Sequence, residues 1–522
     1  MQKPRLIYYT DGHHFHAKRI EPPASIHMLQ WPADEVAGTG VDLLVLGLGY
    51  GDVYFHNSKA GRVVGDKKEV WENYIDWRIM RMVEEGKKLG TDQLREVIKH
   101  GRDLGITVFP SLKLQDSAKQ GDERCGWLKW NKGAEVCIGE GKLQWNYDFA
   151  RQDVRDDKLA IAREVLEDYG ADGLELDFEF GGALFKPSEA VKNTGLMNDY
   201  VAQFRKLAKE IGKKQKREIK LMARIEADRE NNLAKGIDVE AWFKQGSIDW
   251  VVGQDRAVLT DPGVQAKWLP DIANAHGGAA YFRPPRRVYD ERVGLPAIEH
   301  YRALGANLKA QGYSGQYHGY LPWPFAEREY QILRELAYPE MFARRDKAFT
   351  TQPKEGEAGK PTTTPHRQVP AVLKEGETVC VDLTVSDDFA SARRDGEMRK
   401  PVLTLRYAFY CIEDDIEVRI NGRPLKKADA EITDERALQI PVQLAGGMSV
   451  QAPLGFSAHW FRWKLELDDV KTGSNRIEVQ VKKTDKRAGF TRSLIGVEIL
   501  TRFKDFVRPE AFDMHRVAPK SG

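Results

Sequence analysis

The sequence predicts an α/β fold, a (β/α)8 (TIM) barrel followed by a C-terminal antiparallel β-sandwich. Short apolar strands alternate with helical patterns up to about residue 345, as is typical of parallel α/β folds. A segment rich in Pro, Thr, Lys and Gly follows, and beyond it the hydrophobic period changes to two. A chain of 522 residues is also too long for one ordinary domain. We therefore expect a barrel domain over residues 1–345, a linker over 346–365 and a β-sandwich domain over 366–510.

Eight short apolar segments are the candidate strands of the barrel. They are Arg5–Tyr9, Asp42–Leu48, Ile106–Leu112, Gly173–Phe178, Ile219–Arg224, Trp250–Gly253, Ala279–Phe282 and Gln316–Leu321. Helical periodicity predicts the covering helices at Thr91–Leu104, Asp157–Tyr169, Leu196–Gly212, Val239–Gln245, Val264–Ala275 and Ala297–Gln311. Eight strands in roughly 330 residues are what a barrel with long loops requires. A doubly wound sheet is the competing fold, but no glycine-rich phosphate loop follows the first strand.

The region after the linker has the alternation of antiparallel strands. Its candidate strands are Glu377–Val385, Val402–Tyr410, Asp415–Ile420, Trp460–Leu467 and Asn475–Val481. The Asn421-Gly422 step predicts a tight turn. Two segments, Val418–Leu425 and Gly473–Val479, resemble the jelly-roll, galactose-binding-like domains. That resemblance implies a β-sandwich and supports the fold rather than sugar binding.

Composition and charge narrow the class of protein. Apolar residues make up 41% of the chain and charged residues 30%, as in globular proteins. The 80 basic and 78 acidic side chains nearly cancel, so we expect no nucleic-acid partner. No apolar run approaches the length of a membrane span, so we expect no membrane partner either.

The sequence leaves the compartment open. Met1 begins a short polar segment that leads directly into the first predicted strand, so we expect no signal peptide here. We expect an exported protein, periplasmic or extracellular, that has lost its leader. A cytoplasmic protein is the alternative. The four cysteines lack the CxxC spacing of a zinc site. The pattern is equally compatible with two disulfides, which would join cysteines 125 to 137 and 380 to 411, and with four free thiols.

The segment Ala171–Phe180 carries the strongest functional signal. It contains four acids, Asp172, Glu175, Asp177 and Glu179, and the last three alternate with large apolar residues. On a β-strand these three carboxylates share one face, where they repel each other and are costly to bury. A solvated edge strand is the alternative. The apolar alternation and the helical pattern just before it favour an interior parallel strand whose C-terminal end opens into a site.

Polar side chains are expected at the C-terminal ends of the other strands, where a barrel places its active site. The candidate substrate-binding residues are Asp11, His13, His14, Arg224, Glu226, Gln254, Asp255, Arg283, Tyr317, His318 and Trp323. Tyr50, Asp52, Arg256, Arg286 and Arg287 are expected at the same rim. Acids, amides, imidazoles and aromatic rings on one rim suit a sugar, because its hydroxyls need polar partners and its ring faces stack on Trp.

Two groups of this inventory have competing interpretations. His13 and His14 have no His or Cys partner at ligand spacing, so we expect no metal and no other cofactor. Arg283, Arg286 and Arg287 are either a solvated loop or a site for a sulfate or carboxylate group.

The acidic segment resembles known families. Asp172 to Glu179 is similar to the DGxDxDxE fourth-strand signature of glycoside hydrolase family 18, with Glu175 where that family has Asp. The wider segment from Val154 to Phe178 is more similar to the glycosyl-hydrolase-like barrels common in planctomycete-type bacteria. Those often continue Leu-Asp-Phe-Met-Arg, where this chain has Glu179-Phe180. The family 18 resemblance implies that Glu179 is the acid/base and that Asp177 orients a 2-acetamido group.

We therefore expect a glycoside hydrolase acting on a neutral or anionic poly- or oligosaccharide. Glu179, Asp177 and Glu175 are the catalytic candidates, and Glu226 and Asp255 are candidates for a second carboxylate. Like charges on one strand should raise at least one pKa, as a general acid requires. Two alternatives stay open: a non-catalytic carbohydrate-binding barrel, and a polysaccharide lyase with His318 or Tyr317 as the base.

Overall fold

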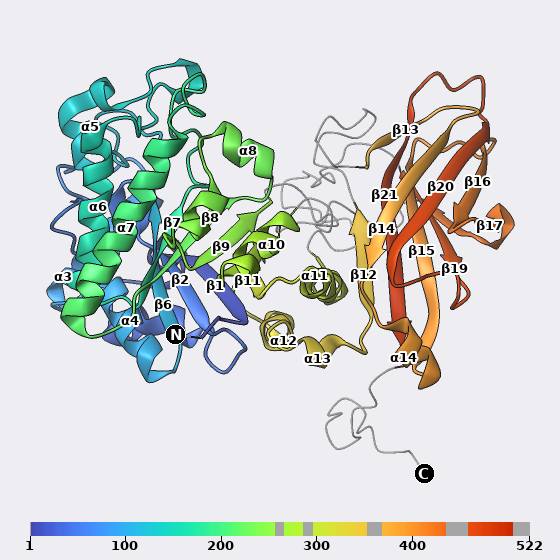
Figure 1. The fold of residues 1–522 in the computed structure, drawn as a ribbon, viewed down its shortest axis with the longest axis horizontal. Coiled ribbons are helices and arrows are strands. Elements are labelled where there is room, and N and C mark those ends of the chain that lie inside the picture. The colour runs from blue at the N-terminus through green and yellow to red at the C-terminus, as the bar shows by residue number, and fades with distance from the viewer. Residues whose placement is uncertain (1, 256–265, 285–295, 352–367, 435–457, 505–522) are drawn as a thin grey trace, which may run out of the picture. The chain divides into compact units, whose positions relative to one another are not determined.

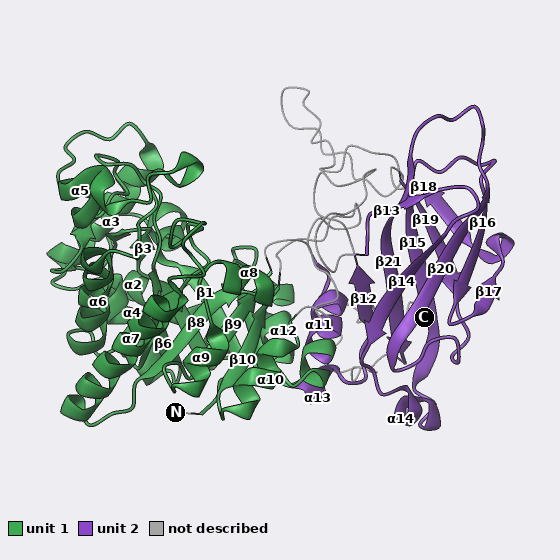
Figure 2. Ribbon diagram, turned by 45° about the horizontal axis from the view of Figure 1, so that its top comes forward, with its two compact units in different colours: residues 1–287, 307–338 green, residues 288–306, 339–522 purple. Residues whose placement is uncertain are grey.

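The computed structural model describes residues 2–255, 266–284, 296–351, 368–434 and 458–504. They form two compact units (Figure 2). Unit 1 comprises residues 1–287 and 307–338, and unit 2 comprises residues 288–306 and 339–522.

Unit 1 is a closed barrel of eight parallel strands, as the sequence predicts (Figure 1). In barrel order the strands are β1 (Leu6–Asp11), β11 (Gly315–Gly319), β10 (Ala279–Arg283), β9 (Trp250–Gln254), β8 (Lys220–Glu226), β7 (Gly173–Asp177), β6 (Thr107–Lys113) and β2 (Leu43–Gly47). Each coincides with a predicted strand to within two residues. A short three-stranded sheet of β3 (Gly49–Tyr50), β4 (Val53–Tyr54) and β5 (Arg62–Val63) follows β2.

The barrel interior is packed, because inward-pointing side chains of all the strands but β7 meet along its axis. They are Ile7, Tyr9, Leu43, Val45, Phe109, Met222, Trp250, Val252, Ala279, Tyr281 and Tyr317. The rings of Phe109 and Trp250 stack with centroids 5.5 Å apart, which closes the lower end of this core. On most strands the next inward residue is polar, as with Asp11, Ser111, Arg224, Gln254 and Arg283, so the apolar core ends where the site begins.

The six predicted helices are present. They are α4 (Gln93–Asp103), α6 (Gln152–Glu167), α7 (Thr194–Gln215), α9 (Val239–Lys244), α10 (Trp268–Ala275) and α11 (Ile298–Ala310). Further helices without a prediction are α1 (Gly12–His14), a π-helix (Phe15–Arg19), α2 (Ile26–Asp34), α3 (Tyr74–Lys88), α5 (Trp127–Lys132), α8 (Arg229–Ala234), α12 (Glu327–Glu335), α13 (Pro339–Phe342) and α14 (Phe389–Arg394). Asn73 caps α3 by accepting hydrogen bonds from Ile75 and Asp76 backbone N–H groups.

Unit 2 is an antiparallel β-sandwich, also as predicted. One sheet is ordered β12 (Lys347–Thr351), β21 (Arg492–Phe503), β15 (Met398–Ala408), β19 (Ala458–Lys464) and β18 (Glu431–Asp434), with β13 (Ala371–Leu373) also on β21. The other is ordered β14 (Thr378–Val385), β20 (Gly473–Lys483), β16 (Asp415–Ile420) and β17 (Arg423–Leu425). Buried residues of both sheets, among them Leu403, Phe461 and Val479, form one core.

Five strands of the sandwich have no counterpart among the predicted strands: β12, β13, β17, β18 and β21. β12 falls in the segment predicted as a linker, and it pairs antiparallel with β21. β21 itself was not predicted. Its residues are buried on both faces for most of its length, so its sequence lacks the period-two alternation. The remainder of the predicted linker lies almost entirely outside the described residues.

The four cysteines form no disulfide, and burial raises the pKa of Cys125 to about 11. Of the helices in the described ranges, none combines the length and the apolar character needed to cross a membrane.

Candidate active site at the C-terminal mouth of the barrel

The fourth barrel strand, β7, presents its acids to the barrel interior. Glu175 is 0% exposed and Asp177, the last residue of the strand, is 1% exposed. Asp177 lies between Lys113 on β6 and Arg224 on β8 in the sheet register. Leu174 and Leu176 point to the opposite side, as the alternation predicts.

Arg224 holds both acids. It donates through Nη2 to Oδ2 of Asp177, and its Nε lies 3.3 Å from Oε1 of Glu175. Oδ1 of Asp177 accepts the backbone N–H groups of Glu179 (2.9 Å) and Phe180 (3.2 Å). Both carboxylate oxygens of Asp177 therefore accept hydrogen bonds.

Glu175 has a different environment. Its Oε1 accepts a hydrogen bond from Oγ of Ser111 (2.6 Å), whereas its buried Oε2 has no hydrogen-bond partner in the described part of the chain. Burial raises the pKa of Glu175, Arg224 opposes this effect and the charge of Asp177 adds to it. The two neighbouring carboxyls thus differ in their hydrogen-bond partners.

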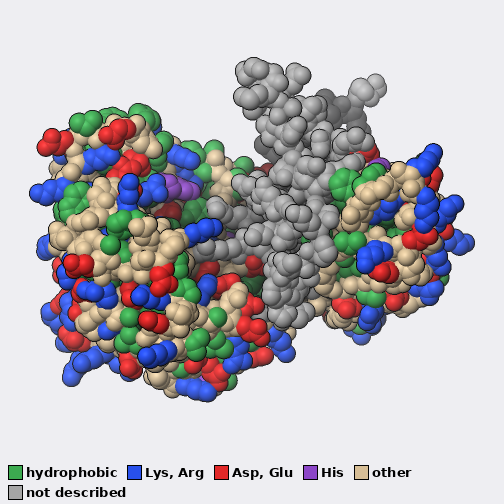
Figure 3. All heavy atoms as spheres, turned by 90° about the horizontal axis from the view of Figure 1, so that it is seen from above, with side chains coloured by type: hydrophobic (Ala, Val, Ile, Leu, Met, Phe, Trp, Pro, Cys, Tyr) green, Lys and Arg blue, Asp and Glu red, His purple; other side chains and the backbone are tan. Residues whose placement is uncertain are grey.

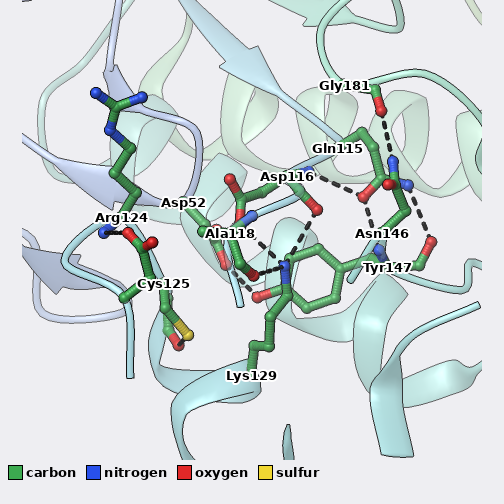
Figure 4. A network of polar contacts seen from close by, with 12 residues as sticks. Asp52, Gln115, Asp116, Ala118, Arg124, Cys125, Lys129, Asn146, Tyr147 and Gly181 are labelled. Carbon is green, nitrogen blue, oxygen red and sulfur yellow. Dashed lines mark hydrogen bonds and ion pairs between the residues drawn. The ribbon is translucent and has the colours of Figure 1, made fainter. Parts of the chain in front are cut away.

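Glu179 follows in a tightly held turn beyond the strand, and it is 5% exposed. Gly181 and Gly182, with φ of 86° and 94°, turn the chain. The amide of Gln115 donates to the carbonyl of Ala183 (2.6 Å), and the amide of Asn146 donates to the carbonyl of Gly181 (Figure 4). These contacts fix the segment that carries Glu179.

A buried polar network locks the loops that follow β2 and β6 (Figure 4). Nζ of Lys129 donates to Oδ2 of Asp116 (2.9 Å) and to the carbonyl of Ala118 (2.9 Å). Asp52 accepts hydrogen bonds from Nζ of Lys158 and from the hydroxyl of Tyr147. Asp52 is therefore buried within this network and is not exposed at the rim, where the sequence placed it. Sequence reasoning missed this network because its members are far apart in the chain and carry no periodic signal.

Asp11 and Lys113 form the second ion pair of the mouth. Nζ of Lys113 lies 3.2 Å from Oδ1 of Asp11 and donates to the carbonyl of Gly49 (2.9 Å). The hydroxyl of Tyr320 donates to Oδ2 of Asp11 (2.8 Å). Burial alone would raise the pKa of Asp11, but the charges of Lys113 and His13 and the hydrogen bonds from Tyr320 and Lys113 together lower it.

His13 and His14 lie at the end of β1 beside this pair. Their ring centroids are 4.4 Å apart, and they contact the rings of Tyr50 (5.1 Å) and Tyr320 (5.1 Å). Burial lowers the pKa of His13 to about 4, so this imidazole is neutral at pH 7. Figure 3 shows histidine side chains gathered on one part of the barrel unit's face, with acidic side chains recessed beside them.

Gln254 and Arg283 complete the inward ring at the ends of β9 and β10. Oε1 of Gln254 accepts from Nη1 of Arg224 (2.8 Å) and from Nη1 of Arg283 (2.6 Å). The guanidinium carbon of Arg283 lies 5.2 Å from the ring centroid of Tyr9 and 5.7 Å from that of Tyr317. The amide oxygen thus brings two guanidinium groups side by side.

His318 is displaced from its predicted place. On β11 it is the register partner of Tyr8, whereas its neighbour Tyr317 pairs with the inward-facing Ile7. Successive side chains alternate, so His318 faces the outer side of the barrel, where its Nε2 lies 2.9 Å from Oε1 of Gln316. Burial and the charge of Arg283 lower the pKa of His318 to about 3.

Other predicted residues lie at the rim with local partners. Glu226 accepts hydrogen bonds from Nζ of Lys235 (2.5 Å) and from Nδ2 of Asn231 (2.8 Å). Trp323 is half-exposed, with the guanidinium of Arg19 4.8 Å from its ring centroid.

Asp255 directly follows β9, and its backbone N–H donates to the carbonyl of Arg283 (3.3 Å). Arg256, Arg286 and Arg287 lie outside the described residues. Across the ranges that are described, no group of three or more His, Cys, Asp or Glu side chains is arranged to hold a metal ion.

No protein-family model and no curated protein matches the chain. Similar solved structures include a cycloisomaltooligosaccharide glucanotransferase from Paenibacillus sp., at 10% identity and a TM-score of 0.35 over 95% of this chain and 57% of that one. Alpha-L-fucosidase isoenzyme 2 from Paenibacillus thiaminolyticus matches at 13% identity and a TM-score of 0.41, over 66% of this chain and 50% of that one. A family 18 N-acetylglucosaminidase from Paenibacillus barengoltzii matches at 11% identity and a TM-score of 0.35, over 63% of this chain and 99% of that one.

These similar structures are glycoside hydrolases and a related transferase by their names. This chain spans only 57% and 50% of the first two proteins. At such low identities and TM-scores the likeness carries no argument about activity.

Proposed function

We propose that this protein is a glycoside hydrolase whose active site is the C-terminal mouth of the barrel. One observation carries the proposal: β7 ends in the buried acids Glu175 and Asp177, and a turn held by the connection between β6 and α6 then presents Glu179. A barrel builds its active sites from side chains at this end of its strands. A purely structural strand has no need of three closely spaced carboxyls there.

The charge balance of the acids supports a chemical role. Arg224 supplies one positive charge to two buried carboxyls, Glu175 and Asp177. Two buried carboxylates that share one cation leave a negative charge without a partner, which costs free energy. The second acid therefore does not stabilise the fold. Enzymes accept this cost where a carboxyl must keep or deliver a proton.

The proposed roles follow from the environment of each acid. Glu179 acts as the general acid: it delivers a proton to the glycosidic oxygen as the bond to the anomeric carbon breaks. Asp177, which has hydrogen-bond donors on both oxygens, stabilises the positive charge that develops on the sugar or attacks the anomeric carbon. Water then supplies the hydroxyl of the product. Glu175 lies deeper and tunes its neighbours.

The lyase alternative has less support. Its candidate base His318 faces the outer side of the barrel. Burial and the proximity of Glu175 raise the pKa of Tyr317 well above 10, so its phenolate is hard to form. The carbohydrate-binding alternative is favoured by one feature, the ion pairs that occupy both Glu175 and Asp177.

Product analysis on a panel of neutral and anionic polysaccharides tests the proposal. New reducing ends without unsaturation would support hydrolysis. Absorbance from a 4,5-double bond would identify a lyase, and retention of a polysaccharide without turnover would identify a binding protein. A Glu189→Gln variant, which changes an exposed acid in the loop after Glu179, serves as the control for general damage.

A further inference from the structure

One cation at the barrel mouth has no counter-ion in the described structure. Arg283 is the last residue of β10 and is 8% exposed. Its Nη1 donates to Oε1 of Gln254 (2.6 Å). None of the carboxylates in the described ranges lies within ion-pair distance of its guanidinium. Among the described residues, the remaining side-chain N–H groups of Arg283 have no hydrogen-bond partner.

The neighbouring cations are neutralised. Lys113 faces Asp11, and Arg224 faces Asp177 and Glu175. Gln254 Oε1 accepts from both Arg224 and Arg283, so the uncompensated charge lies next to a compensated one. A charge removed from water without a partner is costly, and a bound anion would remove that cost.

Three aromatic rings hold the guanidinium of Arg283 in place. The ring centroids of Tyr9, Tyr317 and Tyr320 lie 5.2, 5.7 and 5.5 Å from its central carbon. Such contacts attract and orient a cation, but they bring no negative charge. They also keep water away, which strengthens the attraction to an anion.

The geometry points to an anionic substrate: we infer that Arg283 binds the carboxylate of a uronic acid or the sulfate of a sulfated sugar at the mouth of the barrel. This inference rests on the proposed function and names its substrate class. A planar guanidinium presents parallel N–H donors that match either oxyanion. The chain Asp177–Arg224–Gln254–Arg283 places the anion site close to the proposed catalytic acids.

Binding of simple anionic sugars tests the inference without any turnover. The thermal unfolding midpoint of the Glu179→Gln protein is measured at increasing concentrations of glucose, glucuronate or glucose 6-sulfate, and its rise reports binding. The same titration is made with Arg283→Met and Arg283→Lys added, and with Arg229→Met as the control, because Arg229 is an exposed arginine of α8.

We expect glucuronate, glucose 6-sulfate or both to bind more tightly than glucose. Arg283→Met should weaken this binding about 10- to 100-fold, because a hydrogen bond to a charged group is lost. The affinity of Arg283→Lys should lie between those of Arg283 and Arg283→Met, since Lys keeps the charge but lacks the parallel N–H donors of a guanidinium. Arg229→Met should leave the affinity unchanged. Binding of glucuronate alone would identify a carboxylate site, and binding of the sulfated sugar alone would identify a sulfate site.

The unliganded variants separate recognition from structure. Removal of an uncompensated cation should leave the thermal midpoint of Arg283→Met unchanged or raise it, whereas a structural role predicts a fall. Equal binding of the three sugars, or anion binding that survives in Arg283→Met, would overturn the inference. If Arg283→Met fails to fold, a structural role is indicated and the inference falls unless Arg283→Lys folds and shows the weakened anion binding.

The two proposals fail in different ways. Arg283-dependent anion binding without cleavage by the native protein would refute the hydrolase and leave the anion site in place. Cleavage of a neutral polysaccharide with equal kcat/KM in the native protein and Arg283→Met would refute the anion site and leave the hydrolase in place.

Discussion

Replacement of Arg224 by Met is expected to destabilise the barrel strongly. Met replaces the aliphatic stem of Arg and carries no charge, so the substitution leaves Glu175 and Asp177 buried without their cation. Their exposures are 0% and 1%, and that of the Arg224 side chain is 5%. Removal of one partner of such a buried pair costs about 3–5 kcal/mol of unfolding free energy at pH 8.

The loss should depend on pH in a defined direction. Burial already raises the pKa of Glu175 in the folded state, and removal of Arg224 raises it further. A carboxyl with a raised pKa binds its proton more tightly in the folded state, so the variant regains stability as the pH falls. The gain is at most ~1.4 kcal/mol per pH unit for each carboxyl that takes up a proton on folding. The deficit should therefore be smaller at pH 5 than at pH 8.

Urea unfolding followed by tryptophan fluorescence at both pH values measures this effect. Arg163→Met is the matched control, since Arg163 is 49% exposed and its ion pairs with Glu210 and Glu167 lie at the surface. The control should lose no more than about 1 kcal/mol, with little change between the two pH values. An Arg224→Met loss as small as that of the control, and equal at pH 5 and pH 8, would refute the electrostatic account of the site.

Three further substitutions test other parts of the account. Glu175→Gln should reduce kcat less than tenfold and preserve or raise the thermal midpoint, because burial already disfavours its charge; a loss of turnover would move Glu175 into the reaction. Burial lowers the pKa of His16 from 6.5 to about 4, so its protonation favours unfolding as the pH falls. The native protein should lose ~2 kcal/mol of unfolding free energy between pH 7 and pH 5 through His16, and His16→Asn should abolish this part of the loss. Urea unfolding at both pH values measures it. An equal loss in the native protein and in His16→Asn would argue against this effect. Gly181→Ala would bring a Cβ atom to 2.8 Å from Cγ of Gln115 at a φ of 86°. Its kcat should fall, and its free energy of unfolding should drop by ~1–3 kcal/mol. Gly170→Ala is the control, because a Cβ atom there meets nothing within 4 Å, and its kcat should be unchanged.

The sequence predicted the barrel because strand alternation and helical periodicity are local signals. The inward direction of Glu175 and Asp177 followed from the same period of two. The predicted inventory named both Tyr317 and His318, yet adjacent strand residues point to opposite sides, so only one of them could face the site. The alternation therefore excludes His318 from the site.

Other features of the site depend on non-local pairing. The sequence showed that Arg224 ends a strand, but not that it faces both acids of the neighbouring strand, because register sets that contact. The network of Lys129, Asp116 and Asp52 was missed for the same reason. Strand β12 lies in the segment predicted as a linker, since its pairing with β21 joins segments about 150 residues apart and leaves no local signal.

The central claim is that the acids at the end of β7 perform hydrolysis. Its most direct test is reducing-end release by the native protein, Glu179→Gln, Asp177→Asn and Glu189→Gln on a substrate that the polysaccharide panel identifies. The account predicts a ~10²–10⁴-fold loss of kcat in Glu179→Gln with an intact fold, because Gln cannot deliver a proton. Asp177→Asn should also lose most of its activity, and Glu189→Gln should retain all of it. Full activity in Glu179→Gln alone would move the acid to Glu226 or Asp255, and full activity in both Glu179→Gln and Asp177→Asn would contradict the claim.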